Sequence, residues 1–117
     1  MNNKVVLTGN VGATPKVTVM PSGNTVVNIT LATNEDYIDR QGQPQRKTTW
    51  HNIVAWNEVA LKVSAHINKG DFISLKGKLN NRSYESLVDV QVSPKKTIQV
   101  PVKRHITEVQ AFEIIKL

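Results

Sequence analysis

The sequence predicts an all-β protein with one helix, a small Greek-key β-barrel. Short segments rich in β-branched residues follow one another between turn signals, and a single amphipathic stretch interrupts them after the third strand. The chain has 117 residues, enough for one core, so residues 1–117 are expected to form a single domain. The pattern alone also fits an SH3-like barrel or a small sandwich.

The first half of the chain reads as strands joined by turns. Residues 4–9, 16–20 and 25–33 are rich in valine, threonine and isoleucine, and "PSGN" at residues 21–24 forms a turn between two of them. The polar stretch at residues 34–46 is long for a connection. It is therefore predicted to be a candidate binding loop.

The next strand carries both tryptophans of the chain, in "KTTWHNIVAWNEVA". Side chains two residues apart on a strand share a face, so Trp50 and Trp56 point the same way, about 20 Å apart. Their face also carries Asn52, whereas Ile53 on the other face suits a core. Both rings are therefore predicted to lie outside the barrel; the alternative is that they are ordinary core or interface aromatics.

A helix follows in "NEVALKVSAHINKG". Val59, Val63 and Ile67 recur at helical spacing, with Asn57 as the predicted N-cap and Gly70 as the glycine just beyond the C-terminus. This places one helix between the third and fourth principal strands.

The second half of the chain alternates as strands backed by a core. In "DFISLKGKL", one face carries Ile73, Leu75 and Leu79, and the other carries Phe72, Ser74, Lys76 and Lys78. "VDVQV" and "TIQVPV" flank "SPKK" and predict a hairpin with a basic tip, and "HITEVQAFEIIKL" is the last strand. The resulting order is that of an OB-fold, a five-stranded Greek-key β-barrel with a helix between strands 3 and 4, here with an extra hairpin between strands 4 and 5.

Composition and charge narrow the function classes. The net charge is +6, and nine basic residues against three acidic ones lie between residues 62 and 104, which favours a polyanionic partner. There is no cysteine, no apolar leader and no run long enough to span a membrane, so a cytoplasmic, nucleoid-associated protein is expected.

The sequence gives little support to catalysis. His51, His66 and His105 are far apart and have no carboxylate at ligand spacing, and "GNVGATPK" lacks the spacing of a phosphate-binding loop. The one acidic cluster, at residues 35–39, falls in the predicted loop. No enzyme activity, no cofactor and no metal site are predicted.

Five segments resemble, in order, the signature segments of the bacterial-type single-stranded DNA-binding protein family: "NKVVLTGNVG", "MPSGNTVVNITLAT", "TTWHNIVAWNEVA", "NKGDFISLKGKL" and "ITEV". The resemblance extends from about Asn3 to Val109. It implies an OB-fold assembled as a homotetramer, with His51 near a subunit contact. It also implies sequence-tolerant binding of single-stranded DNA in replication, recombination or repair.

The same resemblance implies which side chains bind DNA. The aromatic residues that stack on bases fall on Tyr37 in the loop after strand 3, on Trp50 and Trp56, and on Tyr84 beyond strand 4, and the matching basic positions are Lys4, Lys69 and Arg82. Charge placement in the sequence adds Lys76, Lys78, Lys95 and Lys96. Stacking on aromatic rings tolerates any base, and lysines follow phosphates without reading bases. The alternatives are incidental loop tyrosines and solvated surface lysines.

Some positions depart from the family pattern. Asn52 and Glu58 stand where members often have basic residues, which predicts a lower affinity. The chain ends at "FEIIKL" without the family's acidic C-terminal tip, so no acidic tail for recruiting replication and repair proteins is expected.

Two other functions fit the same residues. One is a tailless primosomal protein similar to replication protein B, which mainly assembles other proteins, and the other is an OB-fold used only for protein interaction. Quenching of tryptophan fluorescence by oligo-dT distinguishes the three: it would be strong for a DNA-binding protein, weak for an assembly factor and absent for an interaction module.

Overall fold

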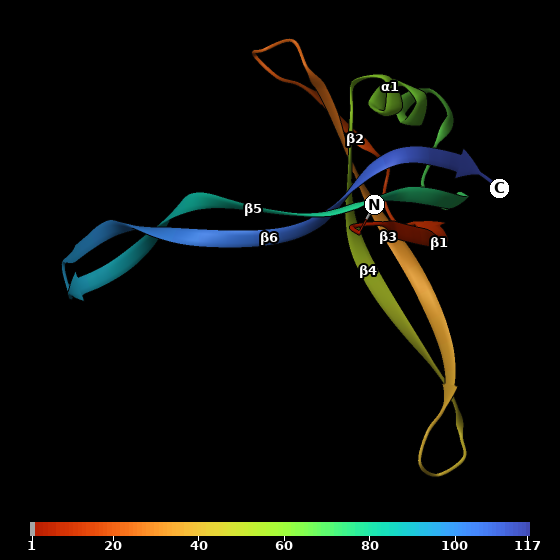
Figure 1. Cartoon of the computed structure of the whole chain (residues 1–117). Helices are drawn as coiled ribbons and strands as arrows, with labels where there is room; N and C mark the ends of the chain where they lie inside the picture. Colours follow the sequence, from red (N-terminus) through yellow and green to blue (C-terminus); the bar gives the residue numbers. More distant parts are fainter. Residues whose placement is uncertain (1) are drawn as a thin grey trace.

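The computed structural model describes residues 2–117. Within this range six strands and one helix follow one another, and they are labelled in Figure 1. Their order is β1 (Val5–Val11), β2 (Lys16–Val19), β3 (Thr25–Ile38), β4 (Pro44–Trp56), α1 (Asn57–His66), β5 (Phe72–Ser93) and β6 (Lys96–Lys116). The helix therefore lies between the two hairpins β3–β4 and β5–β6, as the sequence predicts.

Five of the strands close into a barrel. The order is β1-β5-β6-β4-β3, and β1 returns to β3 through the pairs Asn10 with Ala32 and Val11 with Leu31. The other closure is the short parallel contact of β4 with β6, in which Ile53 lies opposite Val109. Strand β2 adds to the edge of β3. The prediction of a five-stranded OB-fold barrel is confirmed.

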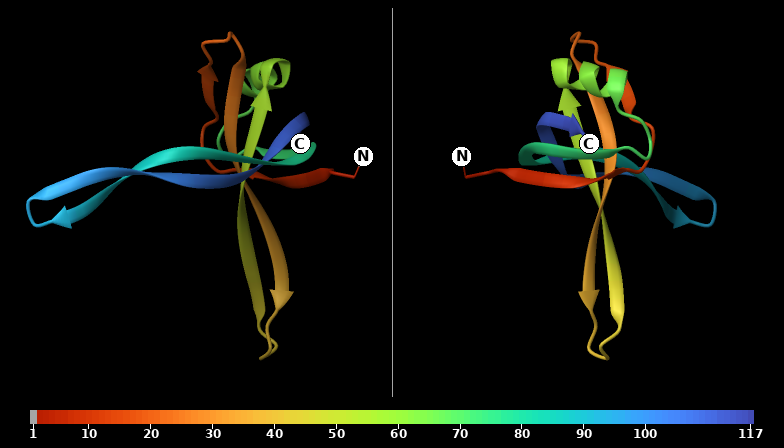
Figure 2. Two further views of the ribbon diagram at one scale, coloured as in Figure 1. Left: turned by 60° about the vertical axis from the view of Figure 1, so that its left-hand side comes forward. Right: turned by 90° about the vertical axis from the view of Figure 1, so that its right-hand side faces the viewer.

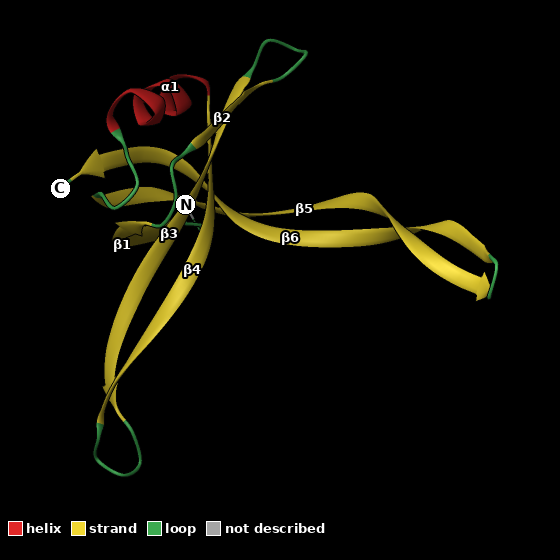
Figure 3. Cartoon of the chain, turned by 180° about the vertical axis from the view of Figure 1, so that it is seen from behind, coloured by secondary structure: helices red, strands yellow, loops and turns green. Residues whose placement is uncertain are grey.

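The core fills this barrel and extends under the helix. Its largest fully buried side chains are Val11, Val27, Leu31, Ile53, Val63, Ile73 and Leu75. Val63 of α1 and Ile67, directly after the helix, are buried, and Val59 packs against the cluster, so the predicted apolar face is confirmed. The helix covers one end of the barrel, as the view from behind in Figure 3 shows.

Both predicted ends of the helix are wrong. Asn57 has a positive φ of 51°, and its side-chain oxygen accepts the backbone N–H of Thr25 at 3.1 Å instead of capping the helix. The helix ends at His66, and Gly70 lies in the following turn, in which the N–H of Asp71 donates to the carbonyl of Asn68 at 3.1 Å. The φ of +90° at Gly70 suits the third position of such a turn, which favours glycine.

Two hairpins extend far beyond the barrel as twisted two-stranded ribbons, in different directions (Figure 2). We call residues 33–49 the β3–β4 arm and residues 80–107 the β5–β6 arm. Because of these arms the radius of gyration is 18.5 Å, whereas a compact chain of this length would have about 13 Å.

The predicted loop at residues 34–46 is mostly wrong, because these residues belong to paired strands. The ladder continues to Ile38 opposite Pro44. Polar side chains also link the two strands: the hydroxyl of Thr48 donates to the side-chain oxygen of Asn34 at 2.6 Å, and Arg46 pairs with Asp36 at 2.9 Å. Polarity here reflects two solvated faces of a ribbon, not an irregular chain.

The predicted hairpin around "SPKK" is confirmed, but it is continuous with the barrel strands. β5 and β6 form one antiparallel ladder, which extends from the pair of Ile73 with Lys116 to the pair of Ser93 with Lys96 and contains two register shifts. Leu79, predicted on the core face, is 52% exposed, because β5 leaves the barrel at this point.

Candidate nucleic-acid interface

The first feature of the candidate interface is Trp50, in the middle of β4. The side chain is 60% exposed, on the outer face, as its alternation with the buried Ile53 predicts. On its inner side the ring lies against Gly12: a Cβ at that position would overlap the indole atom Cζ3. The backbone of Gly12 is fixed by its N–H, which donates to the carbonyl of Thr30 at 2.8 Å. Trp50 therefore presents a supported ring to solvent.

Beside this ring is an open hollow of about 130 Å³, which we call the Trp50 hollow. It lies between β4 and the base of the β5–β6 arm, and it is lined by Trp50, His51, Asn52, Leu79, Thr107, Glu108 and Val109. The exposed Leu79 thus contributes apolar surface next to an exposed indole.

Trp56, at the end of β4, has a hollow of its own of about 230 Å³, the Trp56 hollow. The ring is 37% exposed, less than that of Trp50. The hollow is lined by Met20, Val26, Asn28, Val54, Trp56, Arg82 and Glu108. Glu108 lines both hollows, so the two hollows meet at this residue, which is itself buried.

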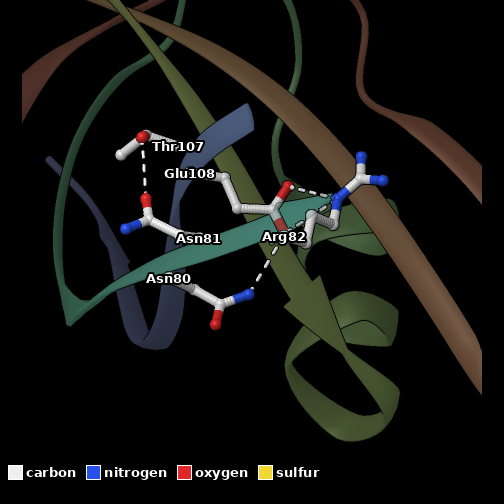
Figure 4. Close-up of polar contacts among 5 residues, drawn as sticks. All are labelled: Asn80, Asn81, Arg82, Thr107 and Glu108. Atoms are coloured by element: carbon white, nitrogen blue, oxygen red, sulfur yellow. Dashed lines mark hydrogen bonds and ion pairs between the residues drawn. The ribbon is translucent and has the colours of Figure 1, made fainter. Parts of the chain in front are cut away.

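An ion pair lies where the two hollows meet. Arg82 of β5 and Glu108 of β6 are joined through Nε of the guanidinium, which donates to the two carboxylate oxygens at 3.2 and 3.3 Å (Figure 4). Asn80 also donates to this carboxylate, at 3.4 Å. The Glu108 side chain is 8% exposed and that of Arg82 is 52% exposed, so only the cation faces solvent.

Tyr84 continues this surface along the β5–β6 arm. It lies within β5, opposite Arg104, and not beyond the strand as predicted. Its ring is 48% exposed, and the guanidinium carbon of Arg82 lies 5.9 Å from the ring centroid. Arg82 is therefore placed between two exposed aromatic side chains, those of Trp56 and Tyr84.

Tyr37 lies apart from the other three aromatic residues. It is part of β3, opposite Gln45, and not part of a loop. Trp50 lies opposite Ala32 in the ladder. Tyr37 is five residues after Ala32 on β3, about 17 Å further along the strand, and alternation puts it on the other face of the ribbon. The structure does not bring Tyr37 into either hollow.

Two of the predicted lysines are sequence neighbours of residues whose hydrogen bonds reach this part of the molecule. Lys4 follows Asn3, whose side-chain amide makes two hydrogen bonds of 3.0 Å with the backbone of Leu79. Lys69 lies in the turn whose Gly70 N–H donates to the carbonyl of Val11, beside the glycine that supports Trp50.

The other predicted lysines lie elsewhere. Lys76 pairs with Glu113 at 4.0 Å, and the ammonium of Lys78 lies 5.9 Å from the ring centroid of Phe112. Both partners line a groove beside α1, outside the two hollows. Lys95 and Lys96 are at the tip of the β5–β6 arm, far from the barrel (Figure 1).

Among residues 2–117 there is no group of three or more His, Asp or Glu side chains that could hold a metal ion. His51 shares a hydrogen bond of 2.8 Å with the hydroxyl of Thr33. In the same part of the chain, no helix is long and apolar enough to cross a membrane.

Sequence reasoning missed most of the residues that line this surface, among them Asn28 and Glu108, and it missed Gly12, which supports Trp50. Nothing in "GNVG" indicates which side chain approaches Gly12. Glu108 could not be found from the sequence, because a single acidic residue in a strand is usually solvated.

A five-stranded barrel of this topology, with supported aromatic rings and basic side chains on one outer surface, defines an OB-fold module of the class that binds single-stranded nucleic acid. The chain belongs to the single-strand binding protein family, whose model matches residues 2–111. The resemblance seen in the sequence is thereby confirmed. The description of this family fits the expectation of a protein that binds single strands.

Two curated relatives are named as single-stranded DNA-binding proteins. The chain is similar to the single-stranded DNA-binding protein of Neisseria meningitidis serogroup B, with 39% identity over 83 residues, which are 71% of this chain and 48% of that protein. It is also similar to single-stranded DNA-binding protein 1 of Chlorobaculum tepidum, with 42% identity over 83 residues, 71% of this chain and 51% of that protein. The chain therefore spans about half the length of these relatives.

Solved structures agree with the fold. A structure described as Plasmodium falciparum SSB complex with ssDNA matches with a TM-score of 0.77 and 26% identity, over 98% of this chain and 94% of that one. A deletion mutant of the single-stranded DNA-binding protein from Thermus aquaticus matches with a TM-score of 0.77 and 23% identity, over 98% of this chain and 50% of that one. The second likeness concerns the fold alone.

Proposed function

We propose that this chain binds single-stranded DNA without reading its sequence, in replication, recombination or repair. The observation that carries the proposal is the pair of exposed indoles, Trp50 and Trp56, on one outer face beside two hollows that share Glu108. Unpaired bases expose their faces for stacking, worth about 1–3 kcal/mol per base, whereas a duplex hides them. The similarity to the Plasmodium falciparum structure with ssDNA supports the proposal.

The proposed DNA path follows the positions of the aromatic and basic residues. It passes Trp50, the meeting point of the hollows and Trp56, and continues to Tyr84 along the β5–β6 arm. Lys4 and Lys69 flank the Trp50 end, and Arg82 lies between Trp56 and Tyr84. Tyr37, Lys95 and Lys96 would be reached only by DNA that leaves the barrel along an arm. Lys76 and Lys78 have the weakest support, since their partners line the groove beside α1.

A fluorescence titration tests this function. Addition of oligo-dT to the protein should quench the tryptophan emission strongly and to saturation, because both indoles would be covered by bases. A duplex of the same length is the control and should quench weakly. Weak quenching by oligo-dT would favour the assembly-factor alternative, and its absence would favour a protein-interaction module.

We further propose that the chain, as one OB-fold domain over residues 1–117, assembles into a homotetramer and is located at the nucleoid with its DNA. Exposed apolar side chains on the barrel and arms, such as Val6, Val19 and Leu87, support an assembly. Light scattering should give the mass of about four 13.0 kDa chains. A monomer at micromolar concentration would contradict the tetramer without affecting the DNA-binding proposal.

A further inference from the structure

We infer that Glu108 is a positioning residue for DNA binding: its buried carboxylate holds Arg82 so that the free end of the guanidinium can bind a phosphate. The inference rests on the proposed function. Glu108 lies in the middle of the proposed DNA path. A carboxylate in this position would ordinarily weaken the binding of DNA by repulsion of its phosphates.

The burial of Glu108 is the first argument. An ionised carboxylate is rarely removed from water unless it is paired and hydrogen-bonded. Here the side chain is 8% exposed, and its oxygens accept hydrogen bonds from Nε of Arg82 and from the amide of Asn80. Asn80 is directly opposite Glu108 in the ladder and Arg82 is two residues further along β5, so both donors come from the same face of one strand.

The geometry of the guanidinium is the second argument. Both oxygens of Glu108 are used by Nε, and the two terminal nitrogens of Arg82 point away from the carboxylate (Figure 4). Arginine carries five N–H donors in a fixed planar fork, so one edge can hold a carboxylate while the terminal groups bind a phosphate. Lysine has its three donors on a single nitrogen, so it cannot hold a carboxylate with one nitrogen and present two others to a phosphate.

The surroundings of Arg82 are the third argument. Its side chain lines the Trp56 hollow, and its guanidinium lies 5.9 Å from the ring centroid of Tyr84. If bases stack on these two rings, the phosphate between them passes close to Arg82. A long arginine side chain loses much rotamer freedom when it is fixed. Glu108 has fixed it before DNA arrives, which lowers the entropic cost of the phosphate contact.

Salt dependence separates positioning from repulsion. Replacing Glu108 with Gln removes a negative charge and should strengthen long-range attraction at low salt, an effect that screening removes at high salt. If Glu108 positions Arg82, the loss of this contact persists at high salt. We therefore expect Glu108→Gln to bind oligo-dT about fivefold more weakly than the wild type at high salt, with a smaller difference at low salt.

Glu85→Gln is the matched control. It removes the same charge from an exposed position of β5. Glu85 lies opposite Lys103 in the ladder, on the other face of the strand from Tyr84. It should bind as the wild type does at high salt. If Glu108→Gln instead binds more tightly than the wild type, most of all at low salt, the carboxylate only repels DNA and the inference is overturned.

Variants of Arg82 complete the test. In an Arg82→Ala background, Glu108→Gln should cause no further weakening, because there is no guanidinium left to position. Arg82→Lys keeps the charge and should bind within about twofold of Arg82→Ala, because it lacks the fork. If Arg82→Lys binds like the wild type, the inference is overturned, even where Glu108→Gln fails to fold. If the wild type itself does not bind oligo-dT, the proposed function fails, and the inference fails with it.

Discussion

The indole ring of Trp50 lies so close to the backbone of Gly12 that a Cβ at residue 12 would overlap its Cζ3 atom. The φ of Gly12 is not among the positive values of the chain, so the glycine is required here for close approach and not for its conformation. Strand β1 and the residue that follows it therefore set the position of a side chain that belongs to β4.

This contact predicts the effect of Gly12→Ala. The added methyl group must displace the indole. We therefore expect the variant to lose about 1 kcal/mol of binding free energy for oligo-dT, which is part of the stacking energy of one base. Fluorescence titration measures the change. In a Trp50→Ala background the same substitution should have no effect on affinity, and an equal loss there would show that Gly12 acts independently of the ring.

Removal of either indole should weaken DNA binding while the fold persists. We expect Trp50→Ala and Trp56→Ala each to cost about 1–3 kcal/mol of binding free energy, because outward rings contribute to the complex and little to the core. Trp56→Ala should reduce thermal stability more than Trp50→Ala, because the Trp56 side chain is the less exposed of the two. Phe112→Ala, at an aromatic residue outside the hollows, is the control. Unchanged affinity per folded molecule would refute stacking.

A lysine that contacts phosphate should change the salt dependence of binding. The logarithm of affinity for a single strand falls with the logarithm of salt concentration by about 0.7 per phosphate neutralised. We expect Lys69→Ala, in the turn whose Gly70 N–H donates to the carbonyl of Val11, to reduce this slope by about that amount. Lys62→Ala removes the same charge from α1, outside both hollows, and should leave the slope unchanged. Equal effects of both variants would indicate net charge alone.

Asp71, in the turn after α1, should make the free energy of unfolding depend on pH in the acidic range. The backbone N–H of Asn68 donates to the Asp71 carboxylate at 2.8 Å and, with help from Lys116 at 3.3 Å, lowers the pKa of Asp71 below its ordinary value of 3.8. Because the pKa of Asp71 is lower in the folded state, its contribution to stability is fully present above the ordinary pKa and is lost as the pH falls through the lowered pKa of the folded state.

Asp71→Asn tests this dependence in unfolding experiments. The variant should be less stable than the wild type at neutral pH, and the difference should shrink as the pH falls below about 4. Asp89→Asn, on the exposed β5–β6 arm, is the control and should show no such convergence. A difference between Asp71→Asn and the wild type that does not depend on pH would contradict the role of the charge.

The end of β6 should be part of the barrel. Ile114 packs against the core and lies opposite Leu75, and the N–H of Leu117 donates to the carbonyl of Phe72 at 2.9 Å. Deletion of residues 114–117 should therefore lower the free energy of unfolding by about 2–4 kcal/mol, in the range of lost core side chains. The double substitution Ile115→Ser and Leu117→Ser, at exposed side chains, should be milder. An unchanged melting temperature after the deletion would show the segment to be dispensable.

The barrel could be predicted because its signals are local. Alternation along β1 and β4, the spacing of Val59 and Val63 on α1 and the turn at residues 94–95 each depend on neighbours within a few positions. The β3–β4 arm could not be predicted, because a ribbon with two solvated faces has no apolar alternation to distinguish it from a loop. Its strands are recognised only through their pairing with each other.

The strands, the outward direction of both tryptophans and the excess of basic residues could be derived from the sequence alone, since strand periodicity and charge are properties of the chain as written. The support of Trp50 by Gly12 and the ion pair that holds Arg82 beside the Trp56 hollow follow only from the three-dimensional fold. These contacts join residues 38 and 26 positions apart. They depend on the register of paired strands and on barrel closure, where a slip of one residue would turn every side chain to the other face.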